Sequence, residues 1–446
     1  MARRKTHPPL LVYLNDHLVG RLDKQTDGAI SFTYDANWLA WEHTLPVSLS
    51  LPLREARYVG APVVAVFDNL LPDVANVRAR VAERVGAAGI DAYSLLAAIG
   101  RDCVGALRFV PEDADPADND HHRAPTLLSD DDVAALIAGL AGAPLGLDAE
   151  DDFRISVAGA QEKTALLRQD GRWFKPHGRT PTTHILKPQI GEIQTAGGAI
   201  DLSNSVENEF YCLKLLSLFG LETAHTEIRE YGGRKVLVVE RFDRLRTADG
   251  RLIRVPQEDC CQALSAPPTR KYQSEGGPGV VAIAGLLKGS DTPLVDQRAL
   301  FMSQLIFWLI GATDGHAKNF SVFLTPGGRF RLTPFYDVLT AQPSYDAGQI
   351  RRNSFKLAMG VGDSNKYRIE EIAGRHFVET GVKARIPSSL VRNIIDEVQD
   401  TAAAIFDRIA AELPPGFPEP LHASVSVAAA ARLKILRAEA AGPGLR

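Results

Sequence analysis

Cysteine is scarce in this chain. Its 446 residues include four cysteines, Cys103, Cys212, Cys260 and Cys261. No pair has the CxxC spacing of a zinc site, and adjacent cysteines rarely form a disulfide with each other. The sequence therefore argues against a zinc ribbon and a disulfide framework, and it predicts a reducing compartment, the cytoplasm.

An excess of positive charge is also missing. The formal net charge is −4, so bulk charge does not favour a protein that coats nucleic acid, although a local basic patch is compatible with the sequence. The composition, 45% hydrophobic and 23% charged, is that of an ordinary globular protein. The length is enough for two or three domains.

Long apolar runs are few. The longest, residues 299–312, contains Ser303 and Gln304 and falls short of the roughly 20 residues that span a bilayer. Residues 10–14, after the basic N-terminus, are too few for a signal-peptide core. The sequence predicts a buried helix at 299–312 and no contact with a membrane.

Hydrophobic periodicity and turn residues divide the chain into four parts. Strands are expected at 10–14, 18–22 and 29–34, and helices within 68–100. A solvated acidic linker at 111–120 precedes a helix that Ser129 and Asp132 would cap. The other expected elements are strands at 165–167, 184–187 and 235–240 and helices at 207–219, 297–312, 389–412 and 423–439.

The expected domains follow from this pattern. They are an N-terminal α+β subdomain (1–110), the linker with its short helix (111–150), a β-rich small lobe (151–243) and a helical lobe (244–446). A β-rich lobe followed by a helical lobe is the order found in protein kinases.

The most informative stretch is residues 313–319 (TDGHAKN), which follow the apolar helix. Asp314 and Asn319 are five residues apart, and Asp337 comes after a predicted hairpin at 320–332. Protein kinases use an Asp, an Asn and a later Asp in this order. The first Asp orients or deprotonates the attacking hydroxyl, and the other two side chains hold Mg²⁺ against the nucleotide phosphates.

The hairpin would return the chain so that Asp337 lies near Asn319, and two oxygen donors suit Mg²⁺. The alternative is that Asp314 and Asn319 are turn residues that form local hydrogen bonds. Their order with Asp337 favours catalysis by Asp314 and metal binding by Asn319 and Asp337.

Lys187 ends a short apolar strand, where a kinase places the lysine that binds the nucleotide phosphates. Glu207 and Glu209 on the following helix could position it, but their spacing puts them on different faces, so only one can do so. The alternative is a surface lysine with two solvated carboxylates.

Three further segments have weaker signals. Residues 156–163 (SVAGAQEK) could cover the phosphates through backbone N–H groups, although they match neither GxGxxG nor a Walker A motif. Residues 240–243 (ERFD) end a strand where backbone groups could bind adenine. Residues 274–279 (SEGGPG) are expected to form a flexible surface loop with no helix directly after it.

The candidate nucleotide-binding residues are Ala158, Gly159, Ala160, Gln161, Glu162, Lys163, Lys187, Glu240, Arg241, Phe242, His316, Asn319, Tyr336 and Asp337. The sequence assigns no definite role to His316.

Seven segments together resemble the HipA family of bacterial toxin serine/threonine kinases. They are 67–73 (FDNLLPD), 98–106 (AIGRDCVGA), 155–164 (ISVAGAQEKT), 184–187 (HILK), 240–244 (ERFDR), 308–321 (WLIGATDGHAKNFS) and 332–337 (LTPFYD). The likeness covers nearly the whole chain in order.

This resemblance implies an α+β, two-lobed, kinase-like fold with an extra N-terminal β-containing subdomain and a helical C-terminal lobe. It implies transfer from ATP with Mg²⁺ to a protein serine, with glutamyl-tRNA synthetase as the target of the closest HipA relatives, and growth arrest with persistence. The implied partner is a HipB-type helix-turn-helix antitoxin, through which operator DNA is mainly bound. Ser156 matches the family's autophosphorylation serine, and its phosphate would expel the loop and block ATP.

Two other functions remain in competition at the level of sequence. One is a nucleotide-binding transcriptional co-regulator with little kinase activity, against which Asp314, Asn319, Asp337 and Lys187 all argue. The other is a small-molecule kinase, which the 156–164 and N-terminal motifs disfavour.

Overall fold

The computed structural model describes residues 7–114, 124–147, 156, 161–195 and 198–440, with the side chains of 438–440 excepted. The chain forms two compact units. The first unit comprises residues 1–188, 229–269 and 322–330, and the second comprises 189–228, 270–321 and 331–446.

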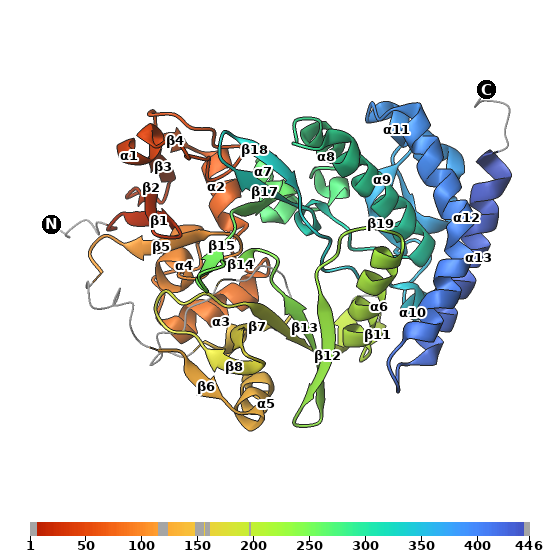
Figure 1. Ribbon diagram of the computed structural model, residues 1–446, viewed down its shortest axis with the longest axis horizontal. Helices are drawn as coiled ribbons and strands as arrows, with labels where there is room; N and C mark the ends of the chain where they lie inside the picture. The colour runs from red at the N-terminus through yellow and green to blue at the C-terminus, as the bar shows by residue number, and fades with distance from the viewer. Residues whose placement is uncertain (1–6, 115–123, 148–155, 157–160, 196–197, 441–446) are drawn as a thin grey trace. The chain divides into compact units, whose positions relative to one another are not determined.

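The first unit begins with a five-stranded antiparallel sheet in the order β4-β3-β2-β1-β5 (Figure 1). Alternating apolar side chains bury one face of it, with Leu10, Val12 and Phe32 fully buried. Its elements are β1 Leu10–Leu14, β2 His17–Lys24, β3 Ile30–Tyr34, β4 Tyr58–Val59, β5 Leu107–Pro111, α1 Ala36–Ala40, α2 Ala61–Asp68, α3 Ala75–Val85 and α4 Ala92–Ile99.

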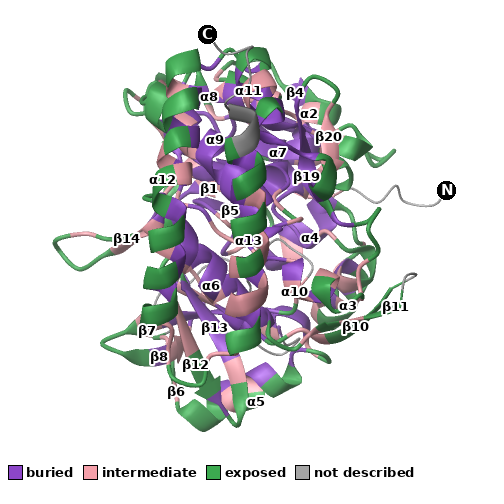
Figure 2. Ribbon diagram, turned by 90° about the vertical axis from the view of Figure 1, so that its right-hand side faces the viewer, coloured by how far each residue is buried: buried purple, intermediate pink, exposed green. Residues whose placement is uncertain are grey.

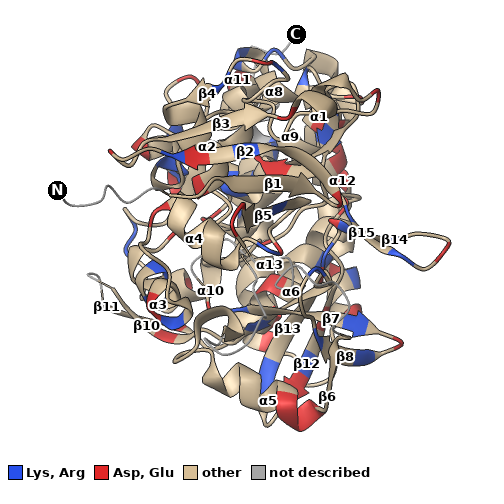
Figure 3. Cartoon of the chain, turned by 90° about the vertical axis from the view of Figure 1, so that its left-hand side faces the viewer, with Lys and Arg blue, Asp and Glu red and all other residues tan. Residues whose placement is uncertain are grey.

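A second sheet has the order β12-β13-β9-β7-β8-β6. Its strands are β6 Thr126–Leu128, β7 Thr164–Gln169, β8 Arg172–Lys175, β9 His184–Pro188, β12 Thr226–Tyr231 and β13 Arg234–Glu240. Helix α5 (Asp130–Gly139) adds Val133 and Ile137 to the core that Trp173 and Leu186 form on the sheet. Ser129 and Asp132 form the predicted capping box, and acidic side chains gather at that end of α5 (Figure 3).

Smaller elements complete the first unit. Helix α7 begins with a capping box between Asp259 and Gln262, and Gln262 also donates to the Val66 carbonyl at the end of α2 (2.8 Å). These elements are β14 Arg244–Arg246, β15 Leu252–Arg254, β16 Gln257–Asp259, α7 Cys260–Ala263 and the β17–β18 hairpin (Ser321–Thr325, Arg329–Leu332), which pairs in the order β16-β17-β18.

The second unit is built around helix α9 (Pro293–Ile310), whose apolar side chains are almost all buried. In Figure 2 the outer turns of α12 and α13 are exposed, because these helices cover the core with one face only. The surrounding elements are α6 Ser205–Leu218, α8 Val280–Leu287, α10 Gln342–Asp346, α11 Gly374–Lys383, α12 Ser388–Glu412, α13 Glu419–Ala440, the β10–β11 pair (Gly191–Thr195, Gly198–Leu202) and the β19–β20 pair (Lys356–Val361, Lys366–Arg368).

The predicted α+β composition is confirmed, as are the strands at 10–34 and the helices at 207–219, 297–312, 389–412 and 423–439, within a few residues at each end. The core of the 111–120 linker lies outside the described residues. Among the described helices, none has the length and apolarity needed to cross a membrane.

Candidate active site

The candidate catalytic loop, residues 312–319, begins where α9 ends. Gly311 adopts a left-handed conformation (φ 71°), and its N–H bonds back to the carbonyls of Phe307 and Trp308. Such a glycine terminates a helix at low cost because it lacks a Cβ. The buried helix α9 therefore holds the start of residues 312–319 in a fixed position.

Asp314 has a side chain that is about half exposed (55%). The phenol of Tyr272 donates a hydrogen bond to its Oδ1. The Nε2 atom of buried His316 lies 3.9 Å from the same oxygen, and the His316 N–H donates to the Asp314 carbonyl (2.8 Å). The carboxylate is thus accessible to a substrate while its surroundings are ordered.

Asn319 joins the two aspartates of the motif. Its Nδ2 donates to the carbonyls of Asp314 (2.9 Å) and Asp337 (3.3 Å). Since both partners are acceptors, the amide must turn its nitrogen toward them and keep Oδ1 as an acceptor elsewhere. The expected approach of Asp337 to Asn319 is confirmed. The bond to Asp314 is one that the turn alternative also predicts, whereas the bond to Asp337 joins residues 18 positions apart and is not a local turn bond.

Asp337 has a left-handed backbone (φ 58°), a conformation that costs energy for a residue other than glycine and often marks a functional site. The segment around it is held on both sides. The Tyr336 hydroxyl donates to the Lys318 carbonyl (2.9 Å), and the Asn208 side chain of α6 pairs with the backbone of Thr340.

The oxygen donors of Asn319 and Asp337 suit Mg²⁺ better than Zn²⁺. Among the described residues, no group of three or more His, Cys, Asp or Glu side chains could hold a metal. Mg²⁺ needs no such group, because it keeps several waters and takes one or two protein oxygens together with phosphate. The Asn319 amide oxygen and the Asp337 carboxylate fit that requirement.

In the first unit, Lys187 lies on β9, opposite Leu237 of β13, and is 6% exposed. Lys163, which precedes β7, is 4% exposed. The alternative of a surface Lys187 is therefore wrong. In the second unit, Glu207 and Glu209 of α6 are both buried, so the alternative of solvated carboxylates is wrong as well.

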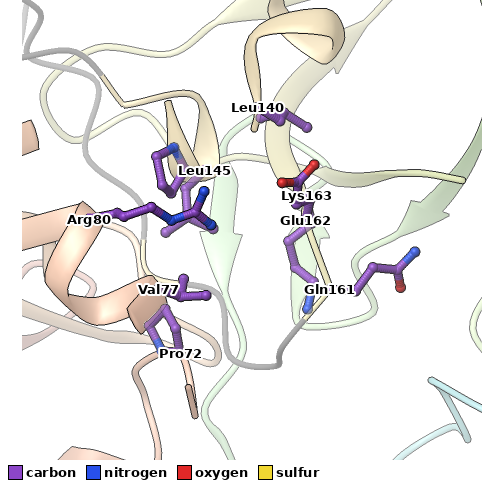
Figure 4. A pocket seen from close by; sticks show the side chains of 9 residues that line it. Pro72, Val77, Arg80, Leu140, Leu145, Gln161, Glu162 and Lys163 are labelled. Atoms are coloured by element: carbon purple, nitrogen blue, oxygen red, sulfur yellow. The ribbon is translucent and has the colours of Figure 1, made fainter. Parts of the chain in front are cut away.

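Part of the proposed phosphate loop lines a small cavity (Figure 4). Glu162 and Lys163 lie across from Val77 and Arg80 of α3 around a volume of about 20 Å³, which Gln161 also lines. That space holds about one water molecule, so it cannot take a nucleotide. The three other loop residues lie outside the described part of the chain: Ala158, Gly159 and Ala160.

Arg241 has a role that the sequence did not reveal. Its N–H donates to the Thr183 carbonyl (2.9 Å), so this backbone group is not available to adenine. Its guanidinium is buried and bonds Asp243 (2.8 Å) and Asp102 (3.4 Å). Glu240 is exposed, and Phe242 is partly buried.

The Arg241 contacts belong to a buried ion cluster, which comprises Asp102, Arg241, Asp243, Arg244 and Arg254. Burial alone would raise the pKa of the Asp102 carboxyl, but the three guanidinium groups outweigh it and hold that pKa well below its usual value. The cluster joins Asp102, near the end of the N-terminal subdomain, to the segment after β13 and to the β14–β15 pair.

Ser156 is fully buried. Its hydroxyl donates to the Leu70 carbonyl (2.6 Å), and its N–H donates to the Asp102 carbonyl (3.0 Å). Both acceptors lie in N-terminal segments that carry the family resemblance, at 67–73 and 98–106.

Tyr272 was missed by sequence reasoning. It lies just before residues 274–279, where we expected a flexible loop with no helix after it, but α8 begins directly at Val280. The sequence signal was the aromatic residue beside a Gly-Gly-Pro-Gly run, which folds as a tight, hydrogen-bonded turn.

Comparisons with known proteins identify the family of this chain. The HipA-like C-terminal domain matches residues 155–406, and the HipA N-terminal domain matches residues 10–110. A putative kinase of Sinorhizobium fredii, Y4mE, is 34% identical over 403 residues, which cover 90% of this chain and 91% of the relative. The serine/threonine-protein kinase toxin HipA of Shewanella oneidensis is 27% identical over 79% of this chain and 78% of its own length.

A solved structure extends the likeness to the fold. The HipA chain in the complex of Shewanella oneidensis HipA, HipB and operator DNA superposes with a TM-score of 0.77 at 23% identity, covering 95% of this chain and 96% of that one. The chain therefore belongs to the HipA family of serine/threonine-protein kinases.

Proposed function

We propose that this chain transfers the γ-phosphate of ATP to a serine hydroxyl of a protein. The observation that carries the proposal is the Asn319 side chain, which ties Asp314 to Asp337 in the order that kinases use. Asp314 would orient the acceptor hydroxyl and receive its proton. The serine oxygen then bonds to the γ-phosphorus as the β–γ bridging bond breaks and ADP leaves.

The other candidate residues would bind the nucleotide. Asn319 and Asp337 would hold Mg²⁺, which neutralises phosphate charge when bound. Lys187 would bind phosphate oxygens, with residues 158–163 as the phosphate loop. Backbone groups of Glu240 and Phe242, rather than the occupied N–H of Arg241, would face adenine, and His316 and Tyr336 would border the phosphate and metal end.

The proposal extends to a toxin–antitoxin role. A relative is named a kinase toxin, and a structural neighbour was solved with HipB and its operator. We infer a HipB-type antitoxin as partner, DNA binding mainly through that antitoxin, and glutamyl-tRNA synthetase as the substrate, whose inhibition would cause growth arrest and persistence. The four cysteines, all of them among the described residues, form no disulfide, which supports a cytoplasmic location.

Autophosphorylation of Ser156 would switch the enzyme off. In the described conformation the hydroxyl is buried against Leu70, so the segment must first leave this site. A phosphate adds about two negative charges at pH 7, which the buried site cannot solvate, so the segment could not return.

The test is transfer of labelled phosphate from ATP, in the presence of Mg²⁺, to glutamyl-tRNA synthetase and to the chain itself, with the phosphoserines mapped by mass spectrometry. We expect transfer by the wild type, including phospho-Ser156, and none by Asp314→Ala. Asp363→Ala, at an exposed position of the same unit, is the matched control and should retain full activity. ATP binding without transfer to any protein would instead support the co-regulator function.

A further inference from the structure

Tyr272 is the side chain that meets the catalytic carboxylate. Its hydroxyl donates to Asp314 Oδ1, and His316 Nε2 approaches the same oxygen at 3.9 Å. Among the contacts of the described residues, both fall on Oδ1, which leaves Oδ2 for an acceptor hydroxyl. A base held by a third group is the usual arrangement of an activated nucleophile.

The turn that carries Tyr272 is closely built. Gly276 is left-handed (φ 87°), and the Gly277 N–H donates to the Tyr272 carbonyl (3.0 Å). A Cβ on Gly277 would lie 2.0 Å from the Arg270 carbonyl oxygen, so this turn requires glycine there. These contacts restrain the backbone next to Tyr272.

A hydrogen bond also anchors this turn to the β19–β20 pair of the same unit. The Gln273 Oε1 atom accepts a hydrogen bond from the Gly360 N–H of β19 (2.8 Å). The Tyr272 ring lies edge-on to the buried His316 ring, with 5.0 Å between centroids and 84° between planes. Aromatic pairs favour this geometry, and here it directs the phenol at Asp314.

Asp314 needs such support because its side chain is 55% exposed. A free carboxylate at the surface samples several rotamers, and each departure from the reactive geometry lowers the rate. A charge-assisted hydrogen bond from a fixed donor selects one rotamer of the carboxylate.

We propose that Tyr272 is a positioning residue of the reaction, whose hydroxyl fixes Asp314 so that Oδ2 faces the acceptor serine. This inference rests on the proposed phosphoryl transfer. The turn at 272–279 is then part of the catalytic apparatus, because a displacement of this turn would displace Asp314 through the Tyr272 hydrogen bond.

The test is steady-state kinetics of Tyr272→Phe, which removes the hydroxyl and keeps the ring against His316. We expect kcat to fall about tenfold, the effect of one charge-assisted hydrogen bond. KM for ATP and the melting temperature should stay at wild-type values. Tyr345→Phe is the matched control. Tyr345 lies on α10, and its hydroxyl also donates to an acidic side chain, that of Glu370. This substitution should leave kcat unchanged.

Three results would overturn the inference. An unchanged kcat would remove any role for the hydroxyl. A rise in kcat would mean that the phenol blocks the carboxylate, and a joint loss of kcat, ATP affinity and melting temperature would mean a structural role. Failure of the proposed function is distinguishable, because the wild type itself would then transfer no phosphate in an assay where Asp314→Ala is the blank.

Discussion

At the scale of single residues, the most perturbed acid that no catalytic role explains is Glu258. It is fully buried in the first unit and accepts the Leu49 N–H at 2.7 Å. Burial raises the pKa of this carboxyl to about 8, and the nearby charge of Asp259 acts in the same direction. The folded chain thus carries a proton here that the unfolded chain gives up at a much lower pH.

Glu258→Gln should remove a pH dependence of stability. Glu258 keeps its proton to about pH 8 when folded but only to about 4.5 when unfolded, so the wild type should lose stability as pH rises between these values. The loss is on the order of a few kcal/mol. Gln is neutral and can still accept the Leu49 N–H, so its melting temperature should match the wild type near pH 5 and exceed it near pH 8.5.

The control for this comparison is Glu55→Gln, at an exposed position of the same unit. Thermal melts of the three proteins across pH 5–8.5 provide the measurement. Parallel curves for the wild type and Glu258→Gln would contradict the assignment of a buried, protonated carboxyl.

Which site residues the sequence revealed depended on how far apart along the chain the partners lie. Asp314, Asn319 and Asp337 share one short segment, so their spacing predicted their approach. Tyr272 lies 42 residues before Asp314, and Arg254 lies 152 residues after Asp102. Contacts of this kind leave no periodic trace in one sequence, so neither the positioning tyrosine nor the ion cluster was foreseen.

At the scale of elements, short helices without a polar face were also not predicted from the sequence. The amphipathic helices α12 and α13 were predicted within a few residues. Helices α2 (APVVAVFD) and α8 (VVAIAGLL) were missed, because an apolar run of eight residues fits a buried strand as well as a helix and their valines favour strands. The longer apolar run of α9 was predicted as a helix.

For the proposed catalysis, the most important element is the junction between α9 and residues 312–319. Gly315 has no Cβ, and the backbone there approaches the Phe307 ring of α9 closely. A Cβ built on Gly315 would lie 2.6 Å from two ring carbons. The loop is therefore supported by the last turn of α9, the helix that precedes it.

Gly315→Ala should displace the loop and lower kcat at least tenfold, because a buried overlap of this kind costs roughly 1–3 kcal/mol. The measurement is kcat together with the melting temperature. Gly285→Ala is the matched control in the same unit, since a Cβ there meets nothing within 4 Å in the middle of α8. It should keep full activity and melt at the same temperature or higher. Equal kcat values for the two variants would contradict the close approach to Phe307.

At the scale of the whole molecule, ion pairs join the N-terminal subdomain to the segment after β13 and to the β14–β15 pair of the same unit. Asp102 bonds Arg254 (2.8 Å), Arg244 (3.0 Å) and Arg241 (3.4 Å), all of them buried. Its backbone carbonyl also accepts the Ser156 N–H. The same loop that completes the ion cluster thus holds the proposed phosphosite.

Asp102→Asn should destabilise the whole first unit, because Arg241 and Arg244 would keep only Asp243 as a carboxylate partner and Arg254 would lose its ion pair with Asp102. Breaking a buried ion network of this kind costs about 3 kcal/mol or more, which lowers the melting temperature by on the order of 5–10 °C. The control is Asp249→Asn, which removes an aspartate paired with Arg251 at the surface and should melt like the wild type.

Since the Ser156 contacts lie in the same loop, Asp102→Asn should also become phosphorylated on Ser156 faster than the control. A variant that melts with the wild type and labels Ser156 at the wild-type rate would show that the cluster neither stabilises the unit nor restrains the serine.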